Sequence, residues 1–305
     1  MFWGTGVWGR VAAVALVVIG VSVAVGAGGS GAGMAVALGS RAGSAGPGAD
    51  VAVIDQVSAA GQRAALDMPQ WQAALAGPRA PRGIPTAVRF YGVSTVGALF
   101  ATMGGAGHFC TAAVVRSTVG DLVLTAAHCV DAGGKAGFAA SAEFVPGYHN
   151  GRQPYGAWAV RDIIVPAGWH RSRDPDLDFA FLVVGRAGGP RIQARTGGLT
   201  VGFSQWYHQT IEAIGYNDGE GTPVGCRAKS FRFRTGQMEF YCRNFRSGTS
   251  GGPWITGYRA KTGTGTVFGV IGGYEEGGDY DWASYSPYFG HELRVLFGQA
   301  EKQAA

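Results

Sequence analysis

From about Thr86 onward the chain consists of short runs of β-branched, aromatic and other apolar residues, each interrupted by glycine, proline or another turn residue. Such runs fit the pleated, half-buried surface of a β-sheet, and the close spacing of the turns leaves little room for helices. Many short strands with little helix predict an all-β sandwich or barrel. The predicted strands are Val93–Phe100, Phe109–Val115, Leu122–Thr125, Trp158–Val165, Phe179–Val184, Thr210–Ile214, Lys229–Arg234, Met238–Tyr241 and Val267–Ile271.

One helix is expected near the C-terminus, over Pro287–Gln299, where Leu293, Leu296 and Phe297 fall on one side. The 305 residues are 47% hydrophobic, so the chain can bury a large core, and all-β chains of this length commonly form one domain. The 53 glycines show no three-residue period, which excludes a collagen-like chain and indicates tight turns and a linker.

The first 40 residues predict an export signal. Arg10 is followed by the apolar run Val11–Val25 and then by small residues. A retained membrane anchor within residues 11–40 is the alternative, because no charged residue occurs between Arg10 and Arg41. The glycine-rich second half favours cleavage, so we expect a secreted protein.

The next segment, residues 41–85, is rich in alanine, glycine and proline, with one short helix expected at Gln56–Ala76. We interpret it as a propeptide or linker. Residues 86–305 form the predicted folded domain. Without residues 1–40 the net charge falls only from +5 to +4, and the basic residues are dispersed, which excludes a nucleic-acid-binding face.

Four cysteines in an exported chain indicate two disulfides. Three pairings are open, and the shortest loops are closed by Cys110–Cys129 and Cys226–Cys242. By the loop-entropy argument each of these disulfides contributes roughly 3 kcal/mol. No C-x-x-C or H-x-x-x-H spacing occurs, so no metal site is expected.

Three short segments carry chemistry in a fixed order: LTAAHC at 124–129, DLDFAFL at 176–182 and SGTSGGP at 247–253. They supply an imidazole in His128, a carboxylate in Asp178 and a hydroxyl in Ser250. A serine hydroxyl is a poor nucleophile unless an imidazole takes its proton and a buried carboxylate holds that imidazole in the right tautomer. The glycines beside Ser250 allow main-chain N–H groups to converge, and the amides of Gly248 and Ser250 are the predicted oxyanion hole.

Two rival interpretations use the same residues. Asp174, Asp176 and Asp178 form a D-x-D-x-D pattern, but a calcium loop of the EF-hand type needs glycine where Phe179 stands. The string around Ser250 also satisfies G-x-S-x-G, the nucleophile elbow of α/β-hydrolases, with Asp279 or Asp281 and then His291 downstream. That elbow requires a helix after the serine, whereas a strand is expected there.

The LTAAHC string resembles the histidine box of trypsin-like and chymotrypsin-like serine peptidases, and the order His128, Asp178, Ser250 matches that superfamily from about Val93 to Phe297. The 72-residue interval from Asp178 to Ser250 is similar to the compact secreted bacterial branch, including actinomycete and glutamyl-endopeptidase-like enzymes. The resemblance implies two packed six-stranded antiparallel β-barrels with the triad in the cleft between them. It implies a secreted, monomeric serine endopeptidase acting on peptides or proteins without a cofactor. A catalytically silent homologue that acts as an extracellular binding module is the alternative.

The sequence departs from the superfamily at several positions. Thr249 replaces the acid before the serine, so activation by a new N-terminal amine is not expected. Gly272-Gly273 stand where the superfamily often has Ser-Trp, and no histidine lies near them, so glutamate specificity is not carried over. Asn244, six residues before Ser250, is a candidate for the base of the primary pocket, with a structural turn asparagine as the alternative.

The predicted substrate-binding residues are therefore Asn244, Gly272 and Gly273. They indicate an uncharged pocket for apolar or aromatic side chains, although Glu275 and Glu276 at a possible rim would favour Arg or Lys. Side chains that no motif places are interpreted as surface or structural for histidine and as core for tryptophan: His108, His149, His170, His208, Trp158, Trp169, Trp206 and Trp254.

Overall fold

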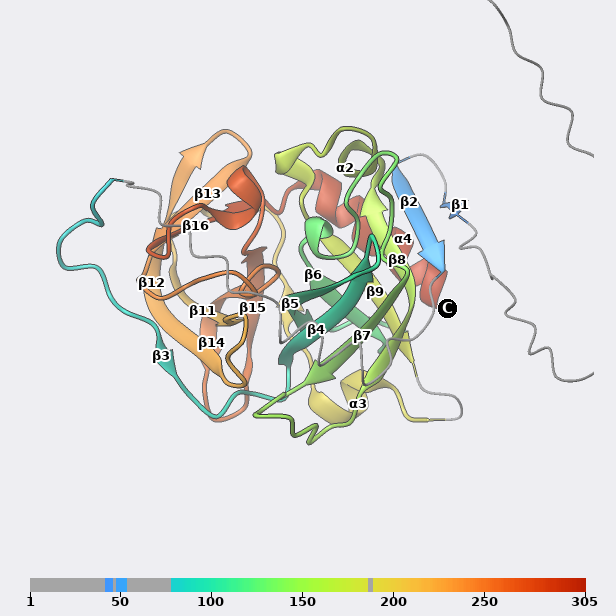
Figure 1. Ribbon diagram of the computed structural model, residues 1–305, viewed down its shortest axis with the longest axis horizontal. Coiled ribbons are helices and arrows are strands. Elements are labelled where there is room, and N and C mark those ends of the chain that lie inside the picture. Colours follow the sequence, from blue (N-terminus) through green and yellow to red (C-terminus); the bar gives the residue numbers. More distant parts are fainter. Residues whose placement is uncertain (1–41, 46–47, 54–77, 186–188) are drawn as a thin grey trace, which may run out of the picture. The chain divides into compact units, whose positions relative to one another are not determined.

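The computed structural model describes residues 42–45, 48–53, 78–185 and 189–305 (Figure 1). The predicted export signal or anchor and the helix expected at Gln56–Ala76 lie outside the described residues. Among the helices of the described part, none is both long enough and apolar enough to cross a bilayer. Strands dominate this part of the chain, and the all-β prediction is confirmed.

The first sheet contains a closed barrel of six antiparallel strands. Hydrogen bonds connect them in the order β8, β7, β4, β5, β6, β9, and β9 pairs back with β8. The strands are β4 (Val96–Met103), β5 (Ala106–Val114), β6 (Leu122–Thr125), β7 (Ser141–Pro146), β8 (Trp158–Pro166) and β9 (Ala180–Gly185). Two more strands, β1 (Ala42–Ala45) and β2 (Ala49–Val53), extend the sheet from β8.

The second sheet is mostly antiparallel and follows the path β10, β15, β14, β11, β12, β13, β16, while β3 pairs with β12. The sequence analysis predicts a second six-stranded barrel here. Six longer strands are present, but among the pairings of the described residues their path does not close on itself. The strands are β3 (Val88–Arg89), β10 (Thr200–Val201), β11 (Thr210–Tyr216), β12 (Pro223–Arg234), β13 (Gln237–Tyr241), β14 (Pro253–Arg259), β15 (Thr264–Val270) and β16 (Ala283–Pro287).

All nine predicted strands are present, β6 with the predicted ends and the others with shifted ends, and β14 is the strand expected after Ser250. The sequence analysis misses β7, β16 and the short strands β1, β2, β3 and β10. β16 reads ASYSP and contains the buried serines Ser284 and Ser286, residues with low strand propensity. The predicted helix is present as α4 (His291–Ala304). It starts four residues later than predicted, because Pro287 still belongs to β16 and Gly290 is the N-cap.

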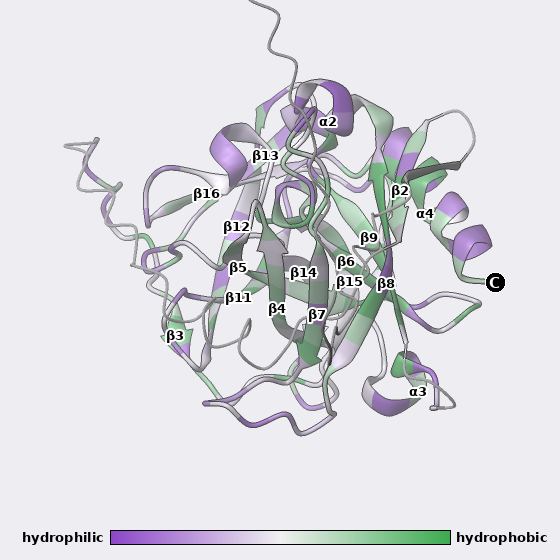
Figure 2. Ribbon diagram, turned by 45° about the vertical axis from the view of Figure 1, so that its right-hand side comes forward, coloured by the Kyte–Doolittle hydropathy of each residue, from purple (hydrophilic) through white to green (hydrophobic). Residues whose placement is uncertain are grey.

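The cores are built from apolar side chains of both sheets. In Figure 2 the strands of the first sheet are largely green, the colour of hydrophobic residues, whereas the short helices α2 (Ala167–Ser172) and α3 (Ile192–Thr196) carry the purple of hydrophilic residues. Trp158, Trp169 and Trp254 are almost fully buried, as predicted. The same prediction is wrong for Trp206, which is 82% exposed in the loop between β10 and β11. That loop turns at Ser204, whose φ is 54°, so Trp206 follows a left-handed turn rather than a strand.

Both predicted disulfides are present, Cys110–Cys129 and Cys226–Cys242. The first joins β5 to the turn after β6, and the second joins β12 to the residue that follows β13. Each disulfide therefore lies within one sheet, as expected for pairings that do not cross between the two halves of the domain.

Candidate active site

His128 lies in the short helix η1 (Ala127–Cys129), which begins where the buried strand β6 ends. Its neighbour Cys129 is tied to β5 by the disulfide to Cys110. The imidazole is therefore held at the end of the first barrel by covalent and strand contacts. The residue is only 7% exposed.

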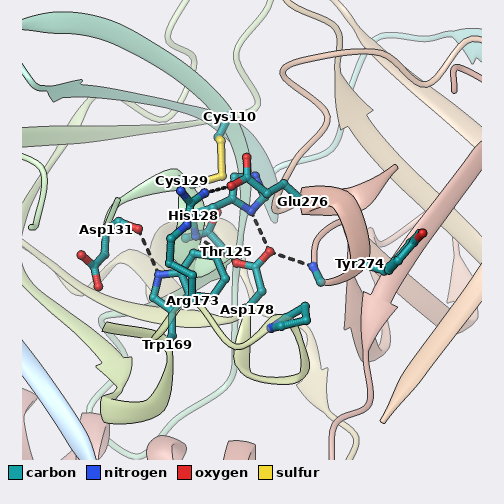
Figure 3. Close-up of polar contacts among 12 residues, drawn as sticks. Cys110, Thr125, His128, Cys129, Asp131, Trp169, Arg173, Asp178, Tyr274 and Glu276 are labelled. Atoms are coloured by element: carbon teal, nitrogen blue, oxygen red, sulfur yellow. Dashed lines mark hydrogen bonds and ion pairs between the residues drawn. A yellow bond between two sulfur atoms is a disulfide. The ribbon is translucent and has the colours of Figure 1, made fainter. Parts of the chain in front are cut away.

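His128 and Asp178 form a buried pair (Figure 3). The Nδ1 atom of His128 lies 2.7 Å from Oδ2 of Asp178, and the main-chain N–H of His128 donates to Oδ1 at 2.9 Å. Asp178 is fully buried. Because a carboxylate only accepts hydrogen bonds, Nδ1 carries the proton in this pair, and Nε2 of the neutral ring keeps its lone pair. This is the tautomer that a general base for a serine hydroxyl requires.

A third donor to Asp178 comes from the second half of the domain. The main-chain N–H of Gly273 donates to Oδ2 at 2.7 Å. Because Gly272 and Gly273 have no side chain that could donate to Asp178, this main-chain amide supplies the hydrogen bond. A Cβ atom added to Gly272 would lie 2.9 Å from Oδ2, so a larger residue there would have to displace the carboxylate. Three N–H groups thus stabilise the buried charge.

A second histidine–aspartate pair, which the sequence analysis misses, lies next to Trp169, the residue whose ring is near His128. Nδ1 of His170 lies 2.9 Å from Oδ2 of the fully buried Asp131, and the indole N–H of Trp169 donates to the Asp131 carbonyl at 3.0 Å. The Trp169 ring centroid is 6.5 Å from that of His128. Asp131 and His170 are 39 residues apart and share no motif, so only the fold brings them together.

The turn that carries Ser250 is anchored to the first barrel. The Ser250 carbonyl accepts from the Thr111 N–H at 2.8 Å, and Gly251 N–H donates to the Ile271 carbonyl at 2.7 Å. Gly251 has a φ of 77°, and a Cβ atom there would lie 2.1 Å from the Thr125 hydroxyl, so this position requires glycine. The turn thus packs against the end of β6, directly before the segment of His128. The Ser250 hydroxyl has no hydrogen-bond partner among the described residues.

The main-chain amides expected to form the oxyanion hole are open. Within the described part of the chain, the N–H groups of Gly248 and Ser250 have no acceptor. Gly248 has a φ of 91°, and its carbonyl accepts from the buried Thr111 hydroxyl at 2.9 Å. A Cβ atom on Gly248 would lie 2.6 Å from the Asp218 nitrogen, which explains why glycine is needed here.

Thr249, directly before Ser250, is buried and its polar groups are hydrogen-bonded locally. Its hydroxyl donates to the Arg246 carbonyl at 2.7 Å, and its N–H donates to the same oxygen at 3.1 Å. The side chain packs against Gly215, where an added Cβ would lie 2.7 Å from the Thr249 Cβ. The turn therefore reaches its conformation without an ion pair at this position.

The three predicted substrate-binding residues lie in two different settings, Asn244 in a turn and Gly272 and Gly273 next to Asp178. Asn244 has a left-handed φ of 70°, and its carbonyl accepts from the Asn217 side chain at 3.3 Å, which is the contact of a turn residue. Gly272 and Gly273 lie beside Asp178, as described above. Glu276, in η3 (Tyr274–Gly277), forms an ion pair with Arg173 (Figure 3), so the charge of one of the two rim glutamates is compensated.

The structure bears on both rival interpretations. Ser250 is followed by the strand β14 and not by a helix, which excludes a nucleophile elbow. Asp174 caps η2 (Pro175–Leu177), since its side chain accepts from the Asp176 N–H at 3.0 Å. Asp176 accepts from Gln237 at 2.8 Å and Asp178 binds His128, so each carboxylate of the D-x-D-x-D pattern has its own protein partner.

The remaining histidines have structural contacts. His149 stacks on Tyr91 with ring centroids 4.3 Å apart, and His208 meets the edge of Phe231 at 5.9 Å. Nε2 of His108 lies 3.6 Å from Sγ of Cys110. Burial lowers the pKa of His108 to about 4, with the nearby His128 as a second cause, so His108 stays neutral at physiological pH.

No protein-family model and no curated protein sequence matches the chain. Solved structures do match. Anisep, a protease from Arthrobacter nicotinovorans, is 25% identical with a TM-score of 0.64, over 71% of this chain and 100% of the other. AL20, a thermostable serine protease from an extremophilic microorganism, is 26% identical with a TM-score of 0.62, over 68% of this chain and 97% of the other.

A Glu endopeptidase is 18% identical with a TM-score of 0.57, over 72% of this chain and 99% of the other, a similarity that concerns the fold alone. All three structures are matched over nearly their whole length. The chain therefore has the chymotrypsin-like fold, and Anisep, AL20 and the Glu endopeptidase are bacterial serine proteases of that fold.

Proposed function

We propose that the protein is a secreted serine endopeptidase in which His128, Asp178 and Ser250 form the catalytic triad. The observation that carries the proposal is the buried His128–Asp178 pair, held by three N–H donors beside the anchored turn of Ser250. The open amides of Gly248 and Ser250 and the similarity to serine proteases support it.

In the proposed reaction, Oγ of Ser250 attacks the carbonyl carbon of the scissile peptide while Nε2 of His128 takes the hydroxyl proton. The negative charge that develops on the carbonyl oxygen is stabilised by the Gly248 and Ser250 amides. When the intermediate collapses, His128 returns the proton to the leaving amine and an ester on Ser250 remains. Water then hydrolyses this ester by the same transfers. Asp178 keeps the ring oriented and stabilises the imidazolium that forms in each step.

Labelling with an active-site fluorophosphonate tests this proposal against a catalytically silent binding module. We expect the label on Ser250, identified by peptide mass spectrometry, and no label on a Ser250→Ala variant of the same fold. A folded wild-type protein that takes up no label would favour the binding module, because an inert serine does not react with this reagent at a useful rate.

The reaction requires a neutral imidazole, because only the neutral ring accepts the serine proton, so kcat/KM should show a rising acid limb and stay high into the mildly alkaline range. His108 supplies the control. Because its pKa is lowered to about 4, it is already neutral along this limb, and His108→Gln should leave the limb in place. Initial rates between pH 4 and pH 9 test the expectation, and an optimum near pH 4 would contradict it.

Activity should not depend on a newly formed N-terminal amine, because Thr249 offers no carboxylate to receive it and its hydroxyl is already bonded to Arg246. Two processed proteins that differ only by two extra residues at the N-terminus should have the same kcat/KM within about twofold. Activity that appears only after cleavage to one unique terminus would refute this expectation.

We further propose an uncharged primary pocket that accepts apolar or aromatic side chains. Asn244 carries no charge, and the Arg173–Glu276 ion pair weakens the case for a pocket that selects Arg or Lys. Cleavage of a peptide library by the processed protein should show this preference at the residue before the cut. Strict cleavage after acidic or after basic residues would contradict it.

A further inference from the structure

In the first barrel, the C-terminal part of β8 pairs with β9 on one side, but no barrel strand pairs with it on the other side. We call this uncovered side the β8 edge. β7 pairs with β8 only at Trp158 and Ala159. Ala159 pairs with β7 on one side and with β9 on the other, and Ile164 pairs with β2 on one side and with β9 on the other. β2 therefore pairs with residues 162–166 of β8 on the same side of β8 on which β7 pairs with Trp158 and Ala159.

The pairing of β2 with β8 is regular over five residues. It is antiparallel, from Ala49 opposite Pro166 to Val53 opposite Asp162, without a bulge. An uncovered β8 would present a row of unpaired N–H and C=O groups at this edge, which is a ready template for another strand. The segment that completes the edge comes from residues 41–85, the stretch that the sequence analysis interprets as propeptide or linker.

The side chains of β2 belong to the core. Ala49, Val51 and Ala52 are only 3%, 4% and 1% exposed, and Ala49 and Val51 are part of the same hydrophobic cluster as the barrel strands. Ile164 and Ile163, the β8 partners of Val51 and Ala52, are fully buried. A segment that only passed over the surface would not bury three of four consecutive side chains in this way.

The same segment also contacts the element that leads to the candidate active site. The N–H of Ala167, the first residue of α2, donates to the Gly48 carbonyl at 3.1 Å. Pro166, the N-cap of α2, provides no side-chain cap. α2 carries Trp169, whose ring is near His128. Strand and helix are thus joined at the point where β8 ends.

We propose that the β8 edge is a docking surface for the chain's own N-terminal segment, and that Ala49–Val53 remains bound there as a non-covalent strand when the chain is cut between Val53 and Pro78. The main-chain ladder gives the segment its register, and the apolar side chains of β2 hold it in the core. A processed protein would then consist of two fragments. The inference goes beyond the proposed function, because it does not depend on hydrolysis.

The test uses the full chain with the recognition sequence of a site-specific endopeptidase inserted between Val53 and Pro78. After cleavage we expect the N-terminal fragment to co-elute with the C-terminal fragment in size-exclusion chromatography in native buffer, and to separate in concentrated urea. Hydrogen exchange of the β8 amides of residues 162–165 should remain slow in the cleaved, native protein. Separation of the fragments in native buffer, with the barrel still folded, would overturn the inference.

A matched pair of substitutions controls for non-specific association. Val51→Asp places a charge in the core next to β8 and should release the fragment and accelerate exchange at residues 162–165. Val88→Asp makes the same change in β3 at a position that is 66% exposed, and should retain the fragment. Slow exchange in β4 and β5 would show that the Val51→Asp barrel is still folded. Equal retention by both variants would also overturn the inference. Neither readout requires hydrolysis, so an inactive but retained complex would count against the proposed function alone.

Discussion

Ser250→Ala and His128→Ala are each expected to lower kcat by about a millionfold while the fold is retained. Without the hydroxyl there is no nucleophile, and without the imidazole the hydroxyl keeps its proton. Because the two groups act in one proton transfer, the double variant should be no slower than either single variant. Burst-free initial rates with a fluorogenic peptide, alongside circular dichroism, measure both parts of the expectation.

Two control variants distinguish the loss of the hydrolytic reaction from a general disturbance of the structure. Ser247→Ala changes an exposed serine three residues before Ser250, and His208→Ala changes an exposed histidine in another loop. Both should keep activity within a few-fold of the wild type, as substitutions away from the reacting atoms do. A folded Ser250→Ala protein with wild-type turnover would show that another residue is the nucleophile.

The parts of the fold that could be predicted are those that local sequence determines. The apolar runs that become β6, β8 and β9 are continuous and bounded by turn residues, so their existence and type follow from propensity and burial. The disulfides were predictable because both close short loops within one sheet. β16 was missed because its serines are buried by pairing with β13 and not by their own hydrophobicity.

In the candidate site, the motifs name His128 and Asp178 as partners and the two side chains lie 2.7 Å apart, whereas the groups that hold them depend on tertiary structure. The third donor to Asp178 is the main-chain amide of Gly273, 95 residues away. Because every residue except proline has such an amide, the residue type does not reveal this contact. The Asp131–His170 pair and the Arg173–Glu276 pair likewise join segments without a shared motif. The roles of Ser250, Gly248 and Asn244 in catalysis and binding remain predictions.

Asp178→Asn is expected to lower kcat by about 10⁴, the loss known for the equivalent change in a serine protease of this fold, with KM little changed. The physical reason is visible in the donors around the carboxylate. Oδ1 accepts from the His128 N–H, and Oδ2 accepts from both His128 Nδ1 and the Gly273 N–H. An asparagine side chain must place its NH₂ group at one of these two positions.

Either orientation of the asparagine amide places its NH₂ group against at least one N–H donor. With NH₂ at the Oδ1 position, it faces the His128 main-chain N–H. With NH₂ at the Oδ2 position, it faces the Gly273 N–H and donates to Nδ1, which moves the ring proton to Nε2 and removes the base. A buried donor without an acceptor also costs about 1–3 kcal/mol of folding free energy. The variant should therefore be both slow and less resistant to urea than the wild type.

The neighbouring Asp176→Asn variant is the matched control, since its side chain is 44% exposed and it does not contact His128. Asp176→Asn should keep kcat within a few-fold, while Asp178→Asn should recover part of its rate at alkaline pH, where hydroxide can take the serine proton in place of the imidazole. Equal losses in the two variants would indicate a general disturbance of the η2 region. Full activity of folded Asp178→Asn would show that the buried carboxylate orients nothing that the reaction uses.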